Sequence, residues 1–256
     1  MHLLKAFILL MSLAVLAMPI MANASYTVTN LNTTVVLNQN TSAQVTEVLT
    51  LKVSNSSVKQ YDTNRIALNL TLSTWQSLIG PLLVQHIINP HSGIYNFKFL
   101  PGPLVPTYYG GEAKLLMTYS VENVTSVVEP APREFVYTFN DNVFNFEHAA
   151  SGEVLPSNTT LSIIIPNGAQ LTSVYPVPDA PVGNFTSGYA NITRFSWFDG
   201  EPLSKFTFVF VTHESLGAEV EGFFSKVYSY LGVFTYIITA LVVIGLILYA
   251  YIRARK

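Results

Sequence analysis

The side chains best suited to chemistry in this 256-residue sequence are four histidines away from the chain ends: His86, His91, His148 and His213. Two histidines one helical turn apart can bind zinc, as in a His-Glu-x-x-His motif. His86 and His91 are five residues apart with a proline between them, so they do not share a helical face. His148 follows Glu147 and could lie beside Asp141, which would suit a hydrolytic site, but no matching nucleophile motif is present.

The motifs of most other catalytic sites are also missing from the sequence. There is no cysteine, which excludes a disulfide framework, a zinc ribbon and a thiol nucleophile. No Gly-x-Ser-x-Gly turn occurs, no glycine-rich loop leads into a helix, and no stretch has the alternating acidic spacing of a calcium loop. We therefore expect no catalytic residue, no metal site and no cofactor. The chain is expected to act by binding and not as an enzyme.

The composition narrows the class of protein. Hydrophobic residues make up 50% of the chain and charged residues 11%, against about a quarter charged in a typical soluble domain. The formal net charge of -2 argues against a nucleic-acid partner. A chain with so few charges must place part of its length in lipid, have an apolar segment removed by cleavage, or keep its surface soluble with groups other than charged side chains.

The amino-terminal residues 1–24 have the three parts of a secretory signal peptide. Lys5 precedes an apolar run from Ala6 to Met21, and a small-x-small site ends at Ala24. We expect cleavage after Ala24. The alternative is an uncleaved anchor, since the run is near the lower length limit for spanning a membrane.

The carboxyl-terminal region has the pattern of a membrane anchor. No charged residue occurs from Val227 to Ile252, and residues 230–252 are long enough to cross a bilayer. The tail 253–256 carries three cations, which predicts that it lies inside and that the rest of the chain lies outside. Because all 15 acids precede Tyr228, the expected ectodomain is net acidic. This describes a single-pass type I protein of the cell membrane in contact with lipid.

The expected ectodomain contains eight Asn-x-Ser/Thr sequons: Asn32, Asn40, Asn55, Asn69, Asn123, Asn158, Asn184 and Asn191. Eight is more than chance would give in a chain of this composition. Each occupied site would place an N-linked glycan on the surface of an exported protein. Glycans would then supply the polarity that charged side chains do not.

The predicted fold class is mainly β, because short β-branched or aromatic segments separated by Asn, Gly, Pro and Ser occur at 33–37, 43–53, 65–72, 95–100, 114–121, 134–139, 160–165, 171–175, 192–197 and 205–212. We expect two antiparallel β-sandwich-like modules, an amino-terminal one at 25–126 with a helical insert and a second at 127–213. The proline-containing stretch 127–133 would link them. A single larger sandwich is the alternative. Within 43–53, the alternation predicts two faces with a bulge near Val48 and Leu49.

Two further segments are expected to be helical. Apolar residues recur at near-helical spacing after a Ser73-Thr74 cap, with Gly80-Pro81 predicting a kink or two short turns: Trp75, Leu78, Ile79, Leu82, Leu83 and Ile87. This short helical segment would cover an end or edge of the sheet, or else touch a partner or the membrane. An amphipathic stalk helix at 214–229 would run straight into the transmembrane helix, with one apolar stripe: Val220, Phe223, Phe224, Val227 and Leu231. That stripe would rest on the ectodomain, the lipid interface or a neighbouring subunit.

The distribution of sequons suggests where a partner docks. No sequon occurs between Asn69 and Asn123 or between Asn123 and Asn158. Aromatic surface free of sugar is suited to protein contacts, although buried strands would lack sequons in any case. Our partner-binding hypothesis names Trp75, Tyr108, Tyr109 and Arg133.

The first β segments also carry a resemblance. The stretch from Thr33 to Leu37, followed by Ser42 to Leu51, resembles the first β module of archaeal type I membrane-anchored surface glycoproteins and, more faintly, of ribophorin-type subunits. The resemblance implies a β-sandwich ectodomain at the cell envelope and brings no catalytic residue with it. We expect a membrane-anchored extracytoplasmic glycoprotein that binds another envelope or membrane protein. The alternative is an accessory subunit of a membrane enzyme or export complex, such as glycosylation or secretion machinery.

Overall fold

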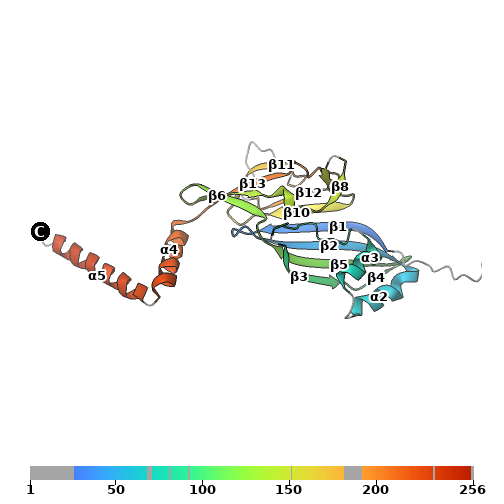
Figure 1. The fold of residues 1–256 in the computed structure, drawn as a ribbon, viewed down its shortest axis with the longest axis horizontal. Helices are drawn as coiled ribbons and strands as arrows, with labels where there is room; N and C mark the ends of the chain where they lie inside the picture. The colour runs from blue at the N-terminus through green and yellow to red at the C-terminus, as the bar shows by residue number, and fades with distance from the viewer. Residues whose placement is uncertain are drawn as a thin grey trace, which may run out of the picture.

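The computed structural model describes residues 26–67, 71–80, 82–91, 93–150, 152–181, 192–232 and 234–254, with some side chains of the last two helices omitted. The predicted signal peptide at 1–24 lies outside this part of the chain. The fold is mainly β, as expected, with helices at the edges of a two-layered body and at the carboxyl-terminal end (Figure 1).

Two larger sheets and one small hairpin contain the strands. The seven-stranded sheet has the order β12 (Arg194–Trp197), β10 (Thr159–Ile164), β1 (Tyr26–Leu37), β2 (Ala43–Ser54), β5 (Gly110–Val121) and β3 (Ile94–Pro101), with β4 (Val105–Thr107) also pairing with β5. The four-stranded sheet has the order β11 (Gln170–Tyr175), β13 (Thr207–His213), β7 (Glu134–Phe139) and β6 (Thr125–Ala131). The hairpin pairs β8 (Glu147–Ala149) with β9 (Gly152–Val154).

The sheet pairings do not follow the predicted division after residue 126. Strand β10 pairs in parallel with β1, placing Val35 opposite Ile163, and β12 extends the same sheet. The two-module prediction with purely antiparallel pairing is therefore wrong for the sheets, because strands from both predicted modules form one continuous sheet. The predicted link at 127–133 is also wrong, since most of it is strand β6, which forms a hairpin with β7. Pro130 is tolerated within β6 because this is an edge strand, and Pro132 lies on the turn that follows it.

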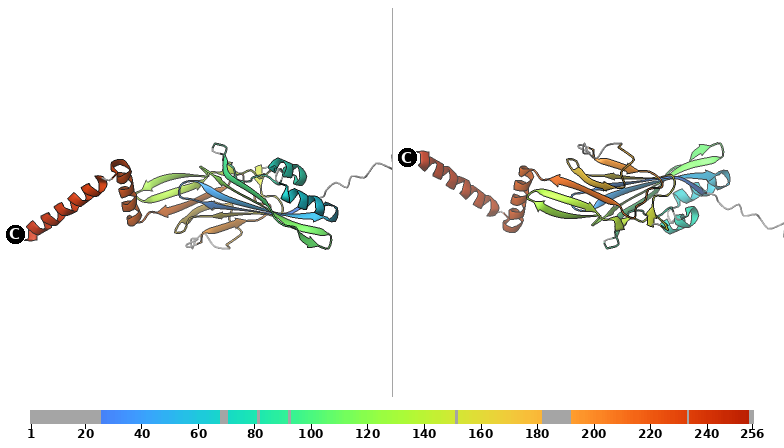
Figure 2. Two further views of the ribbon diagram at one scale, coloured as in Figure 1. Left: turned by 90° about the horizontal axis from the view of Figure 1, so that it is seen from below. Right: turned by 90° about the horizontal axis from the view of Figure 1, so that it is seen from above.

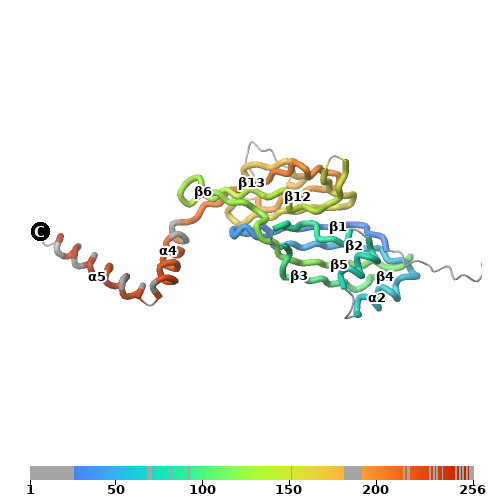
Figure 3. The backbone as a smooth tube through the Cα atoms, in the orientation of Figure 1, coloured from blue at the N-terminus to red at the C-terminus, as the bar shows by residue number. Residues whose placement is uncertain are grey.

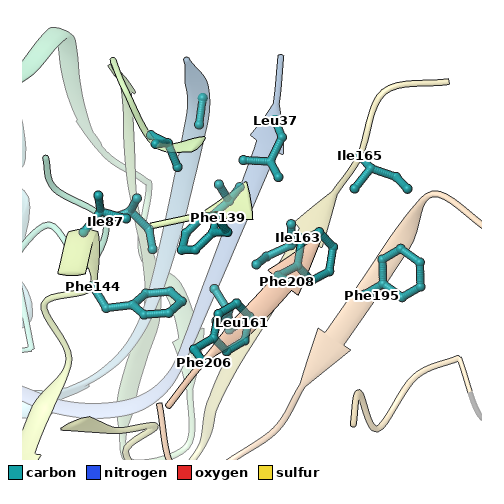
Figure 4. Packing of buried hydrophobic residues seen from close by; sticks show 14 of the residues in the cluster. Leu37, Ile87, Phe139, Phe144, Leu161, Ile163, Ile165, Phe195, Phe206 and Phe208 are labelled. Carbon is teal, nitrogen blue, oxygen red and sulfur yellow. The ribbon is translucent and has the colours of Figure 1, made fainter. Parts of the chain in front are cut away.

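The main core lies between the two larger sheets. Figure 4 shows Phe206 and Phe208 packing toward Leu161 and Ile163 across the layers. The alternation predicted for 205–212 is confirmed, because Phe206, Phe208 and Phe210 are all buried on one face. This core draws on both halves of the sequence, so neither half encloses it alone.

A second core covers the other end of the seven-stranded sheet. Here the cover is helical, from α2 (Val58–Ile66) and α3 (Leu72–Ile79), which lie beside β4 and the adjoining ends of β1 and β2 in Figure 1 and in both views of Figure 2. Tyr61 and Trp75 are fully buried, with their rings 5.7 Å apart in an edge-to-face arrangement. The strand predicted at 65–72 is wrong, because its described residues belong to α2, to the chain after it and to the start of α3.

The short predicted helix is confirmed only in its first part. Helix α3 begins after Thr71, whose hydroxyl accepts a hydrogen bond from the Thr74 backbone N–H, and ends at Gly80 with φ of 103°. The predicted cap at Ser73 and Thr74 is therefore displaced by two residues. Leu82 to Ile87 do not continue the helix, because the chain turns at Gly80 and runs on as a loop over the sheet.

At the carboxyl-terminal end the chain forms two helices set apart from the sheets, α4 (Leu216–Leu231) and α5 (Phe234–Ala254) (Figures 1 and 3). They are not one straight helix as predicted, because Gly232 has φ of 57° and its N–H donates to the Tyr228 carbonyl oxygen, which ends α4. Val220, Phe223 and Phe224 on α4 are exposed, whereas the side chains of Glu219 and Leu231 lie outside the described set. Among the residues that are described, no helix combines the length and apolar character needed to cross a membrane.

Because β1, β2 and β5 pass through both cores, we predict that the β body unfolds in one cooperative step. The chain has two tryptophans, Trp75 in the helix-covered core and Trp197 in the core between the sheets. In each of the single-tryptophan variants Trp75→Phe and Trp197→Phe, fluorescence and far-ultraviolet circular dichroism of the full chain in mild detergent are expected to follow the same urea transition. Fluorescence and dichroism transitions that separate in either variant would point to two independent units.

Candidate functional site

The seven-stranded sheet is covered by the four-stranded sheet at one end and by α2 and α3 at the other. The candidate site lies where these two covering layers meet. On β2, alternate residues face the cores without interruption, and Glu47 falls between Val45 of the first core and Leu49 of the second. The bulge predicted near Val48 and Leu49 is wrong, because β2 pairs residue by residue with β5 over its whole length. Regular alternation places the Glu47 side chain inside, where it is 0% exposed.

Three donors converge on the buried Glu47 carboxylate. The Tyr119 hydroxyl and the His86 backbone N–H both donate to Oε1, each at 2.5 Å. The Nδ1 atom of His86 lies 2.8 Å from Oε2. The Tyr119 oxygen in turn accepts the Ile87 backbone N–H at 3.1 Å. A carboxylate without such partners would be costly at this depth, so the network stabilises the seam between the cores.

The network also fixes the chemistry of each member. Burial raises the pKa of the Tyr119 phenol far above its ordinary value, and the charge and hydrogen bond of Glu47 add to that effect. The phenol therefore stays protonated and donates. An ionised carboxylate can only accept, so Nδ1 of His86, the ring nitrogen that faces it, carries a proton and donates.

The loop that carries His86 is tied to the second half of the chain. The Ile88 N–H donates to the Val143 carbonyl at 2.6 Å, and the Asn145 N–H donates to the His86 carbonyl at 2.9 Å. The His86 ring also packs on Phe146, with ring centres 5.0 Å apart. Figure 4 shows Ile87 and Phe144, which form an isolated β-bridge, side by side at this junction.

A cleft of about 540 Å³ opens beside this junction. Its lining, as far as the structure describes it, is partly apolar and partly polar and includes no lysine or arginine: Leu82, Val84, His86, Asn145, Phe146, Glu147, Pro156 and Ser157. His86 is only 3% exposed, and both its Nδ1 and its backbone N–H are bonded to Glu47. The remaining ring nitrogen, Nε2, forms no hydrogen bond to any described residue, so it is the polar atom that the ring can offer to the cleft.

The four residues of the partner-binding hypothesis do not form one surface. Trp75 is 1% exposed and belongs to the second core, so its assignment to a docking surface is wrong. Tyr108 and Tyr109 are 87% and 81% exposed on the turn from β4 to β5. Arg133 lies on the turn between β6 and β7, toward the opposite end of the body (Figure 1). Of this set, the two adjacent tyrosines remain as a candidate contact.

The tyrosine tip, meaning Tyr108 and Tyr109, is held by the chain on either side. The two rings meet edge to face with centres 4.7 Å apart. Gly110 follows with φ of 142°, and a Cβ there would collide with the Val53 carbonyl oxygen, so only glycine brings the turn this close to β2. The tyrosines line a groove of about 510 Å³ with Lys52 and Glu112.

The sequons that the structure describes are all exposed at their asparagine: Asn32, Asn40, Asn55, Asn123 and Asn158. Asn69, Asn184 and Asn191 lie outside the described residues. Accessibility is what attachment of a glycan requires, and occupancy stays a prediction.

The other three histidines considered for chemistry, His91, His148 and His213, lie at the surface. His148 Nε2 is 3.6 Å from the Glu153 carboxylate on the β8–β9 hairpin, and its side chain is 72% exposed. Burial raises the pKa of Glu153, and His148 partly opposes that effect. Within the described ranges, no three His, Cys, Asp or Glu side chains gather as metal ligands.

The Glu47 network was missed by reasoning from sequence, although β2 contained a signal. Glu47 has the same parity as Val45, Leu49 and Leu51, and a single acid on an otherwise apolar strand face indicates a buried, partnered carboxylate. Its partners could not be read from the sequence, because His86 and Tyr119 are 39 and 72 residues away.

Comparison of the chain with protein-family models gives no match, and comparison with curated proteins gives no significant match. Any assignment of function therefore rests on residue pattern and geometry.

We predict that removing the Glu47 carboxylate destabilises the fold strongly. Glu47→Ala leaves the His86 and Tyr119 donors buried without an acceptor, so the free energy of unfolding should fall by about 3–5 kcal/mol. The measurement is urea denaturation of the full chain in mild detergent. Glu122→Ala, which removes an exposed glutamate, should change the value by less than about 0.5 kcal/mol. Equal effects of the two substitutions would show that the network is not stabilising.

The buried phenols predict a loss of stability in alkali. Burial raises the pKa of Tyr61 to about 12 and that of Tyr119 further, whereas tyrosine in the unfolded chain ionises near pH 10. Above about pH 10 the unfolded chain therefore binds fewer protons than the native chain, and the free energy of unfolding falls as pH rises. Tyr119→Phe should reduce this slope by up to about 1.4 kcal/mol per pH unit, and Tyr109→Phe, at an exposed position, should not. An unchanged slope in Tyr119→Phe would contradict the assignment.

Proposed function

We propose that this chain is a membrane-anchored extracytoplasmic glycoprotein that acts by binding another envelope or membrane protein. The observation that carries the proposal is the tyrosine tip, because two adjacent large aromatic side chains are more than four-fifths exposed on a turn fixed by its backbone. Tyrosines are favoured in protein interfaces because they bring a large contact area and lose little conformational entropy on binding.

The position of the tyrosine tip suits recognition at a distance from an anchor. The β4–β5 turn lies at one end of the β body, and α4 and α5 lie beyond the other end (Figure 1). If α5 holds the chain in the membrane, the tip is the part of the described body held farthest from the bilayer. A partner that projects from the envelope could then reach it without contacting the lipid.

Membrane anchoring is supported by the sequence of the carboxyl-terminal region. No charged residue occurs from Val227 to Ile252, and three cations follow. The uncharged stretch 230–252 would, as a helix rising about 1.5 Å per residue, extend about 34 Å, enough to cross the hydrocarbon core of a bilayer. With the cations inside, the β body and its sequons lie outside the cell.

A second candidate function is that of an accessory subunit of a membrane enzyme or export complex. The exposed apolar face of α4 favours it, because Val220, Phe223 and Phe224 are 47%, 63% and 45% exposed. In that case the contact surface would be α4 and α5, and not the tip.

We predict that the double variant Tyr108→Ser/Tyr109→Ser loses a specific partner. The full chain would be purified from its native membrane in mild detergent, and proteins present in stoichiometric amounts would be identified by mass spectrometry. The tip variant should retain less than about a tenth of the partner, since loss of aromatic anchors commonly costs more than 2 kcal/mol of binding. Tyr175→Ser, at a 53% exposed position on β11, should retain it. A partner that survives the tip variant and is lost from Phe223→Ser would favour the accessory role.

The absence of cysteine allows a direct test of orientation. In Ser126→Cys the new thiol lies on the exposed edge strand β6, and in Lys256→Cys it lies at the end of the chain. A membrane-impermeant maleimide applied to intact cells should label the first variant and should label the second only after the membrane is permeabilised. Labelling of Lys256→Cys in intact cells would exclude a single span with the tail inside.

A further inference from the structure

The cleft beside His86 plays no part in the proposed binding through the tyrosine tip. We propose that this cleft binds a neutral, hydroxyl-rich ligand, namely a sugar ring. The inference does not rest on the tyrosine tip, so the two can fail separately.

The polar atoms of the cleft match hydroxyl groups better than charged groups. Besides His86, the lining offers the Ser157 hydroxyl and the Glu147 carboxylate, with Asn145 beside them. An anion would meet no cation among the lining residues and would be repelled by Glu147. An organic cation would meet only the solvent-exposed carboxylate of Glu147 among the described lining residues, because the buried Glu47 is already bonded to three donors. Sugar hydroxyls both donate and accept, so a mixture of uncharged and acceptor groups satisfies them.

The apolar part of the lining supplies the other half of sugar recognition. Leu82, Val84, Phe146 and Pro156 form a surface on which the C–H face of a sugar ring can pack. Of these, Phe146 and Pro156 are buried and fixed, and Phe146 is held against His86 and Phe144. At about 540 Å³, the cleft falls in the size range of small-molecule sites.

His86 is prepared for this role before any ligand arrives. The residue is 3% exposed, and Glu47 and Phe146 fix the orientation of its ring, so Nε2 can form a hydrogen bond with a ligand hydroxyl without loss of side-chain freedom. The cleft leaves room beside the ring for a ligand hydroxyl to form this hydrogen bond.

Two sources of sugar fit the position of the cleft. Ser157 lines it, and the next residue is Asn158, an exposed sequon asparagine. The first sugars of a glycan on Asn158 could turn back into the cleft, or the cleft could receive a sugar from another molecule. The chemistry recognised is the same in both cases, and only the molecule that carries the sugar differs.

The test uses the full chain in mild detergent, with N-acetylglucosamine and glucose as probes and saturation-transfer NMR as the readout. Asn158→Gln removes the sequon at the rim and leaves the cleft open. This variant should bind at least one probe at millimolar concentration. Adding Ser157→Trp, which fills the mouth from an exposed position, should weaken binding at least tenfold. Adding Ser126→Trp instead, at an exposed serine on β6, should not.

The outcomes separate the sources and can overturn the proposal. Binding by Asn158→Gln but not by protein glycosylated at Asn158 indicates that the chain's own glycan occupies the cleft. Equal binding by both indicates a sugar from another molecule. The proposal is wrong if neither form binds either probe, or if binding is unaffected by Ser157→Trp. If the tip variant keeps its protein partner while Asn158→Gln binds a probe, the proposed function is wrong and this inference holds. If the tip variant loses its partner while neither form binds a probe, this inference is wrong and the proposed function holds.

Discussion

The buried carboxylate of Glu47 is the constraint on which the rest of the fold depends. It lies on a strand face that continues through both cores, at the point where one cover ends and the other begins. A carboxylate there is tolerated only if donors reach it, and His86 and Tyr119 supply them. The hydrogen bonds from His86 to Glu47 hold the loop after α3 against the sheet. This loop in turn contacts the segment around Phe144. The Glu47 carboxylate therefore links three stretches of chain that are distant in sequence.

In this arrangement the surfaces available for binding are separate from the hydrophobic cores that stabilise the fold. The seven-stranded sheet is a rigid support, covered at one end by a second sheet and at the other by two helices. The cleft beside His86 lies at the seam between the covers, the tyrosine tip lies at one end, and the two terminal helices lie beyond the other end (Figure 1). Sites carried by short loops on such a support can differ in chemistry without disturbing the cores.

Local patterns predicted much of the strand content, and their failures have physical causes. The alternation of Phe206, Phe208 and Phe210 gave β13 correctly because one face of that strand is wholly buried. Segment 65–72 has strand-like residues but contributes to two short helices, since tertiary packing on Tyr61 and Trp75 outweighs weak local propensity. The bulge predicted on β2 is absent, because Val45, Glu47 and Leu49 alternate without a break and all face the cores.

By itself, the sequence determined the β class, the apolar chain ends, the acidic charge of the central region and the set of sequons, because composition and short periodicities express these directly. Only the tertiary structure decided the pairing of β1 with β10, the burial of Trp75 and the meeting of Glu47, His86 and Tyr119. The reason is that sheet order and side-chain contacts across tens of residues depend on which folded arrangement buries the most apolar surface while satisfying every buried polar group. No local window of sequence contains that information.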